Sequence, residues 1–158
     1  MKRPFNQSAY DAHDKKNKEE LCKIMTDKGY ELVGDIEKEN FKKYDLKFKH
    51  QKTAVELSFE NETRDVFDRI KNVFKTIHIP IRKKNTQADF YIVWNPTMTE
   101  MFLIEKEVIE KCKSEIVNVK CKEGHVNYEY EENFIDIPKK MVSLYYKDHL
   151  GKWRKQNK

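Results

Sequence analysis

The sequence predicts a single α/β domain in which helices flank a mixed central β-sheet. Three stretches carry this prediction. Residues 44–60 alternate apolar and polar side chains, residues 66–74 space their apolar side chains as one helix face, and residues 88–95 form a continuous apolar run. These patterns are typical of a half-buried hairpin, an amphipathic helix and a fully buried strand. The chain has 158 residues, which suits one domain with its own core.

The first expected element is a helix that is capped by Asn6 or Ser8 and runs to about Lys28. Gly29 is a natural stop for it. Its apolar side chains have helical spacing, as shown by Leu21, Ile24 and Met25. An apolar patch and an acidic loop then lead into the hairpin.

The hairpin of residues 44–60 has one apolar face and one charged face. A two-residue turn at His50-Gln51, or a four-residue loop one step wider, sets Asp45 opposite Glu56. A slip by one residue is excluded because it would put apolar side chains on the charged face. Two facing carboxylates destabilise a strand pair, but a cation between them makes the arrangement tolerable. Because Mg²⁺ binds carboxylate and phosphate oxygens, the hairpin hints at a metal site.

The elements after the hairpin follow from similar patterns. A helix over residues 66–74 is expected to be capped by Asn61 or Thr63 and to pack on the sheet. The alternating strand of residues 77–81 contains Pro80, which favours a sheet edge. Further expected elements are strands at 88–95 and 101–104, a short helix to residue 113, a hairpin of residues 116–121 and 126–130, and a last helix from Pro138 to Gly151. The folded domain is therefore residues 1–150, and residues 151–158 form a basic, mobile tail.

Composition and charge narrow the classes of partner. Charged residues make up 37% of the chain and the formal net charge is +5, which fits an anionic partner such as nucleic acid. A soluble, lysine-rich surface is the alternative explanation. No apolar run is long enough to span a membrane and no signal-peptide pattern is present, so we expect a cytoplasmic protein without membrane contact.

The three cysteines lack the spacing of a disulfide framework, which favours a reducing compartment. Cys112, Cys121 and His125 could form a partial zinc set, but no fourth ligand is evident. Incidental or buried cysteines are the alternative.

The hairpin resembles the core of the PD-(D/E)xK nuclease superfamily, which has an Asp on one strand and Glu-x-Lys on the next. Here the Asp is Asp45 and the Glu is Glu56, but Ser58 stands where the motif has Lys. The segments TIHIPIRK and ADFYIVWNPTMTEMFLI resemble the later strands of small phage and bacterial members, and QSAYDAHDKKNKEELCKIMTDKGY resembles their first helix. The likeness spans most of residues 6–146. It implies a restriction-endonuclease-like fold. It also implies a protein made in a bacterial or phage-infected cell.

The resemblance implies an Mg²⁺- or Mn²⁺-dependent DNA endonuclease or exonuclease in which Asp45 and Glu56 hold the metal. In some members a glutamate of the first helix joins the metal site, as Glu19 or Glu20 could here; a solvated acidic face is the alternative. Lys47 lies on the charged face of the hairpin and could replace the missing Lys. So could Arg82 or Lys83 from the next strand.

The strand of residues 77–81 offers two further groups. His78 and Arg82 share the side opposite the three isoleucines of this strand. If the strand lies in the same sheet as Glu56, His78 could position or deprotonate water and Arg82 could clamp a phosphate. Otherwise both are structural. The cluster Arg82, Lys83 and Lys84 is the predicted nucleic-acid contact.

An alternative function is a catalytically inactive module with the nuclease fold that binds nucleic acid or a protein partner. Ser58 in place of Lys supports it, and so does Trp153 within the basic tail, because aromatic and basic groups together suit strand binding. Trp153 could equally be a loosely packed structural residue. The sequence is also compatible with a phage accessory protein that has neither role. Separately, it is compatible with a homodimer.

Overall fold

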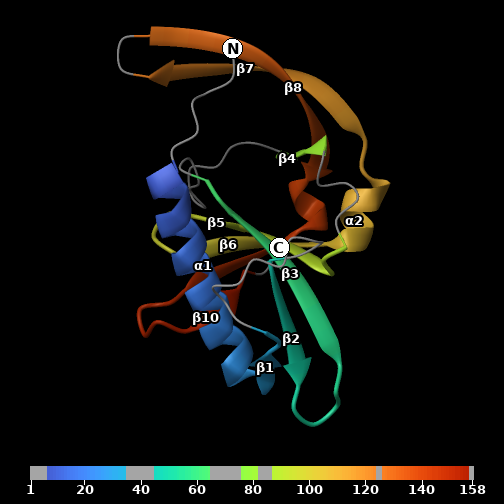
Figure 1. Ribbon diagram of the computed structural model, residues 1–158. Helices are drawn as coiled ribbons and strands as arrows, with labels where there is room; N and C mark the ends of the chain where they lie inside the picture. The colour runs from blue at the N-terminus through green and yellow to red at the C-terminus, as the bar shows by residue number, and fades with distance from the viewer. Residues whose placement is uncertain (1–6, 35–44, 65–75, 82–86, 124–125, 157–158) are drawn as a thin grey trace.

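A computed structural model describes residues 7–34, 45–64, 76–81, 87–123 and 126–156 (Figure 1). Its elements are α1 (Gln7–Asp27), β1 (Tyr30–Leu32), β2 (Leu46–His50), β3 (Glu56–Thr63), β4 (Thr76–Pro80), β5 (Phe90–Trp94), β6 (Glu100–Glu105), α2 (Lys106–Lys111), β7 (Ser114–Glu123), β8 (Val126–Pro138), the 3₁₀ turn η2 (Lys139–Met141), β9 (Ser143–Lys147) and β10 (Trp153–Lys155).

The described strands form two sheets within a single α/β domain. The larger sheet has seven strands in the order β1-β2-β3-β5-β6-β9-β10, and the smaller has three in the order β4-β8-β7. The larger sheet is mixed, because β3 and β5 are parallel whereas the other pairs are antiparallel. The predicted α/β class with a mixed β-sheet and helices is therefore confirmed.

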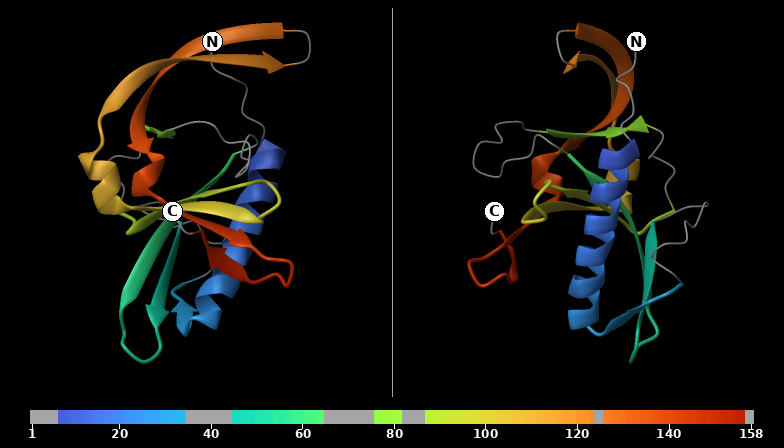
Figure 2. Two further views of the ribbon diagram at one scale, coloured as in Figure 1. Left: turned by 180° about the vertical axis from the view of Figure 1, so that it is seen from behind. Right: turned by 60° about the vertical axis from the view of Figure 1, so that its left-hand side comes forward.

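The larger sheet lies between two layers (Figures 1 and 2). Ile92 and Trp94 of β5 pack with α1 in one buried cluster, whereas Tyr91 and Val93 pack with β4, β8 and α2 in another. Because successive strand residues point to opposite faces, α1 covers one face and the small sheet with α2 covers the other. Four consecutive side chains of β5, Tyr91 to Trp94, are no more than 1% exposed, so the predicted buried strand is confirmed.

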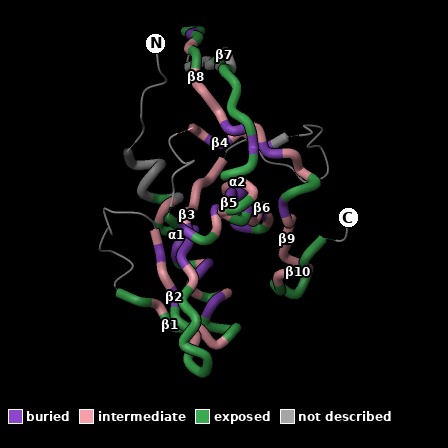
Figure 3. Tube along the Cα trace, turned by 90° about the vertical axis from the view of Figure 1, so that its right-hand side faces the viewer, coloured by how far each residue is buried: buried purple, intermediate pink, exposed green. Residues whose placement is uncertain are grey.

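Strands β7 and β8 continue beyond the core as a two-stranded ribbon that arches away from the larger sheet (Figures 1 and 2). The described side chains of β7 are exposed along its length (Figure 3). The expected hairpin is thus confirmed and is longer than predicted. Strand β4 lies at the edge of the small sheet, as Pro80 indicated.

The predicted last helix is wrong. After η2, residues 143–147 form strand β9, which pairs with β6. Leu144, Tyr145 and Tyr146 favour a strand, and the free edge of β6 supplies their backbone partners. The prediction of a mobile tail is also wrong for Trp153–Lys155. These residues form the edge strand β10, which pairs with β9.

The two residues predicted as alternative N-caps for a helix of residues 66–74 lie in a strand instead. Asn61 and Thr63 belong to β3 and pair with Ile92 and Trp94 of β5. The predicted helix of residues 66–74 lies outside the described residues. The first helix is confirmed as α1, and the short helix before residue 113 is confirmed as α2.

Ala54, in the loop between β2 and β3, has a φ of 59°, which a residue with a Cβ adopts at a cost. Its amide donates to the carbonyl of His50, so the turn depends on this conformation. We expect Ala54→Gly to raise the free energy of unfolding by about 0.5–1 kcal/mol, measured by urea denaturation. Ala54→Val should shift it the other way, because a β-branched residue tolerates this φ least; equal effects of the two changes would contradict the argument.

Candidate functional site

The register of the β2–β3 hairpin differs from the predicted one. Lys49 pairs with Glu56 and Leu46 pairs with Phe59, and the amide of Asp45 also donates to the carbonyl of Phe59, at 2.9 Å. The loop is Gln51–Ala54, because the amide of His50 donates to the carbonyl of Val55. Amides of Lys52 and Thr53 donate to Nδ1 of the His50 side chain and so hold the loop two residues later than expected.

Glu56 pairs with Lys49, so the predicted pairing of Asp45 with Glu56 is wrong. They are four positions apart along the strands, which is about 13 Å at a rise of about 3.3 Å per residue. One metal ion cannot bind both side chains at such a separation. The Glu56 carboxylate instead lies 3.5 Å from Nζ of Lys47 at the exposed end of the hairpin.

Ser58 has a structural contact. Its amide and hydroxyl both donate to Oδ2 of Asp89, at 2.8 and 3.1 Å. The side chain is buried, and it ties β3 to the residue just before β5. Ser58 thus lies where the nuclease motif has Lys, but it brings no positive charge there.

Helix α1 places polar side chains where a buried stripe is expected. Asp14, Asn17 and Lys18 fall at i, i+3 and i+4, in line with the buried Leu21 and Met25 of the next turns. Asn17 is 2% exposed and Lys18 is 7% exposed. Nζ of Lys18 lies 3.0 Å from the Asp14 carboxylate. The half of α1 nearer its N-terminus therefore presents charge to the sheet.

Asp45 faces this polar part of α1. The backbone amide of Asn61 donates to Oδ2 of Asp45 at 2.7 Å. Burial raises the pKa of Asp45, and the charges of Glu60 and Asp14 raise it further, whereas the Asn61 amide and the Lys18 ammonium act in the opposite direction. A partly buried carboxylate is thus held beside two others and one ammonium, which is an arrangement typical of cation sites.

Two buried amide atoms near Asp45 lack partners among the described residues. They are Oδ1 of Asn17 and Nδ2 of Asn61. The opposite atoms of the same amides are engaged: Nδ2 of Asn17 contacts Thr63 at 3.5 Å, and Oδ1 of Asn61 accepts from Trp94 at 2.9 Å. Buried polar atoms normally have partners, so this layer has capacity for a water or an ion-bound ligand.

The proposed glutamates of the first helix lie elsewhere. Glu20 accepts from Nζ of Lys147 at 2.8 Å and from Nε1 of Trp153 at 3.0 Å. Burial opposes ionisation of Glu20, but these two contacts outweigh it and lower its pKa. Trp153 packs edge-on against Trp94, with ring centroids 5.8 Å apart, so it has packing contacts with the core of the domain. Glu19 is exposed.

Glu20 and Trp153 also border an open cavity of about 530 Å³ between α1 and the β9–β10 end of the sheet. Lysines outnumber carboxylates around it. Its lining comprises Glu20, Lys23, Ile24, Asp27, Lys28, Lys147, Gly151, Lys152 and Trp153.

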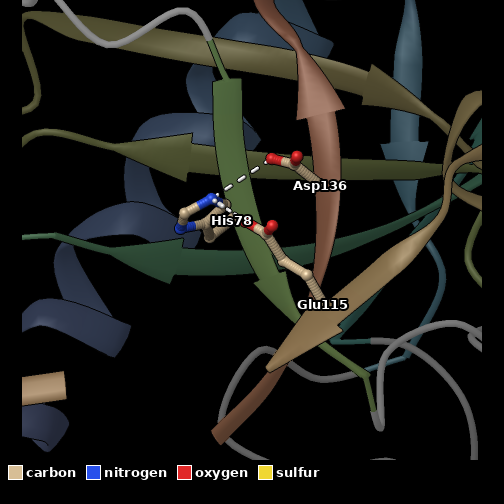
Figure 4. A group of neighbouring side chains, drawn as sticks. All are labelled: His78, Glu115 and Asp136. Atoms are coloured by element: carbon tan, nitrogen blue, oxygen red, sulfur yellow. Dashed lines mark ion pairs between the residues drawn. The ribbon is translucent and has the colours of Figure 1, made fainter. Parts of the chain in front are cut away.

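His78 lies in the small sheet and not beside Asp45 and Glu56, so the conditional grouping of these three residues is wrong. Its ring nitrogen Nε2 lies 3.2 Å from Oε1 of Glu115 and 3.2 Å from Oδ1 of Asp136 (Figure 4). Among the described residues, this trio alone brings three potential ligand atoms within 4.8 Å of one another. Arg82, Lys83 and Lys84 fall outside the described residues, as does His125 of the partial zinc set.

No family model, no curated protein and no solved structure matches the chain. In the described part of the chain, no helix has the length and apolarity needed to cross a membrane.

Proposed function

We propose that this protein is an Mg²⁺-dependent phosphodiesterase acting on DNA, with a restriction-endonuclease-like core of the PD-(D/E)xK type. The observation that carries the proposal is the buried Asp45 carboxylate, which feels the charges of Glu60 and of Asp14 and Lys18 of α1. The order of a first helix, an antiparallel hairpin and a parallel neighbour strand also supports it.

The residues fit a hard divalent cation. Asp45 and Glu60 offer carboxylate oxygens, and Mg²⁺ commonly uses one or two of these together with waters and phosphate oxygens. The raised pKa of Asp45 reflects burial beside like charges, which a bound cation would relieve. Bound there, Mg²⁺ would polarise a phosphate and lower the pKa of an attacking water.

Lys18 supplies the positive charge that Ser58 lacks. Its ammonium acts on Asp45 and lies against Asp14, so it reaches the hairpin from the helix rather than from the strand. Because Lys18 is nearly excluded from water, its charge is only weakly screened. It would stabilise the negative charge that builds up on the phosphate, while Asp45 and Glu60 hold the metal.

A module that binds nucleic acid without cutting it is the second candidate. Two features of Ser58 favour it. Ser58 carries no positive charge where the nuclease motif has Lys, and its side chain is hydrogen-bonded to Asp89. The net charge of +5 supports binding to nucleic acid under either function. Binding that is insensitive to metal, without turnover, would select this candidate.

The test is cleavage of duplex, single-stranded and branched DNA with Mg²⁺ or Mn²⁺, with and without chelator. We expect metal-dependent turnover that falls at least about tenfold in Glu60→Gln, because a metal-facing carboxylate is lost. Glu56→Gln is the matched control and should keep wild-type activity, since Glu56 lies at the far end of the hairpin. Loss of activity in Glu56→Gln with full activity in Glu60→Gln would overturn the placement of the site.

A further inference from the structure

We propose that His78, Glu115 and Asp136 form a second metal site, separate from the hairpin, that binds a divalent transition-metal ion of the Zn²⁺ class. The three side chains come from the three strands of the small sheet and converge on one point (Figure 4). This inference does not depend on the proposed nuclease function.

The distances suit direct ligation. A tetrahedral ion bound at about 2.0–2.2 Å separates its ligand atoms by about 3.4 Å. Nε2 of His78 lies 3.2 Å from one carboxylate oxygen of Glu115 and 3.2 Å from one of Asp136. The trio therefore needs only small side-chain adjustments to enclose an ion.

A simple ion pair accounts poorly for Asp136. Its Oδ1 is buried, and no described group forms a hydrogen bond with it, although Nε2 of His78 lies only 3.2 Å away. The contact is therefore close but badly aligned for an N–H donor. A buried carboxylate oxygen without a donor is costly, and an ion between the imidazole and the carboxylate would satisfy it.

The backbone holds the three residues in place before any ion binds. His78 and Asp136 are direct cross-strand partners, and Glu115 pairs with Phe134 on the other side of β8. The imidazole stacks on the Phe134 ring, with centroids 5.7 Å apart and planes 23° apart. Arg64, at the end of β3, donates to the carbonyl of His78. Such preorganisation lowers the entropic cost of ligation.

The donor set predicts which ion binds. One imidazole with two carboxylates suits Zn²⁺, Mn²⁺ or Fe²⁺ better than Mg²⁺, because imidazole favours transition metals. Three protein ligands leave a fourth position for water. The ion would link β4 to the base of the β7–β8 ribbon, so its binding should stabilise the small sheet.

The experiment is a Zn²⁺ titration of chelator-treated protein by calorimetry, with thermal unfolding as a second readout. We expect one Zn²⁺ to bind and this binding to require His78. Bound Zn²⁺ should also raise Tm, because a ligand that binds the native state stabilises that state. His78→Gln and Asp136→Asn should each weaken binding at least about tenfold. His149→Gln is the matched control, since His149 is exposed and lies in the β9–β10 turn.

Asp45→Asn should bind Zn²⁺ as the wild type does, which separates this site from the hairpin site. Wild-type protein that binds no Zn²⁺, or His78→Gln that binds it with unchanged affinity, would overturn the proposal. In the first case the trio is an ion-pair cluster, and in the second the zinc is bound by other residues such as the cysteines.

Discussion

Asp45→Asn is expected to lower metal-dependent DNA cleavage by more than about 100-fold and, at the same time, to make the fold more stable near neutral pH. Activity falls because the buried carboxylate at the hairpin site is lost. Stability rises because Asn can still accept the Asn61 amide through its side-chain oxygen, but it carries no charge beside Glu60 and Asp14. Opposite effects on activity and stability indicate a residue kept for function.

The pH dependence of the stability difference follows from the direction of the pKa shift. Burial raises the pKa of Asp45 above its unfolded value, so the folded state binds this proton more tightly. The free energy of unfolding therefore decreases as pH rises from the unfolded pKa, about 3.9, through the folded pKa. The advantage of Asp45→Asn should be absent below this window and complete above it.

Thermal or urea unfolding of both proteins across acid to neutral pH measures this difference. Added Mg²⁺ should raise Tm for the wild type and leave Asp45→Asn unchanged. Glu56→Gln provides the control, since its carboxylate is exposed and lies beside Lys47. If Asp45→Asn is less stable than the wild type at neutral pH, then the Asp45 carboxylate is structural and the metal-site proposal loses its main support.

The sequence allowed good predictions wherever a local pattern determines the structure. Gly29, with its φ of 87°, ends the first helix region as expected, and the alternation around Leu46 and Phe59 correctly predicted the apolar hairpin face. Parity, however, cannot distinguish registers that differ by an even number of residues, and the His50 side chain decided between them.

The site residues missed from the sequence depend on contacts between distant segments. The charge of Glu60 acts on Asp45 in the register that the shifted loop sets. Asp14 and Lys18 carried a signal that was present in the sequence: they continue the stripe of Leu21 and Met25, where apolar residues are expected. For residues 143–147 the apolar spacing suited a helix, but the open edge of β6 imposed a strand, which is a tertiary effect.

The small sheet could not be predicted from residues 77–81 alone. Their alternation predicted a strand, and Pro80 predicted an edge, but neither indicates which sheet the strand joins. The pairing of His78 needs Asp136 of β8, which lies 58 residues later in the chain. The sequence therefore pointed to His78 as a functional candidate beside Asp45 and Glu56. In the fold, His78 instead lies beside Glu115 and Asp136.

Lys18→Met is expected to lower DNA cleavage by about 100- to 1,000-fold, the loss that follows removal of one fixed electrostatic group from a site. Met has similar length and can fill the buried space that the lysine stem occupies. Asp14 loses its partner but is partly exposed, so water can solvate it and the stability should change little.

Two readouts distinguish an electrostatic role of Lys18 from a packing role. Because the Lys18 charge lowers the pKa of Asp45, its removal should raise that pKa further and shift Mg²⁺ binding toward higher pH. Lys18→Arg keeps the charge and should retain more activity than Lys18→Met. Lys16→Met is the matched control, because Lys16 is exposed two residues earlier on the same helix.

The pH profile of Mg²⁺ binding gives the decisive result for Lys18. If Lys18→Met and Lys16→Met have the same cleavage rate and the same profile, then Lys18 does not take the role proposed for it at the site. The module that binds nucleic acid without cutting it would then be the better account. If only Lys18→Met shifts the profile, the buried ammonium acts on the Asp45 carboxylate from the helix and supplies the positive charge that Ser58 does not.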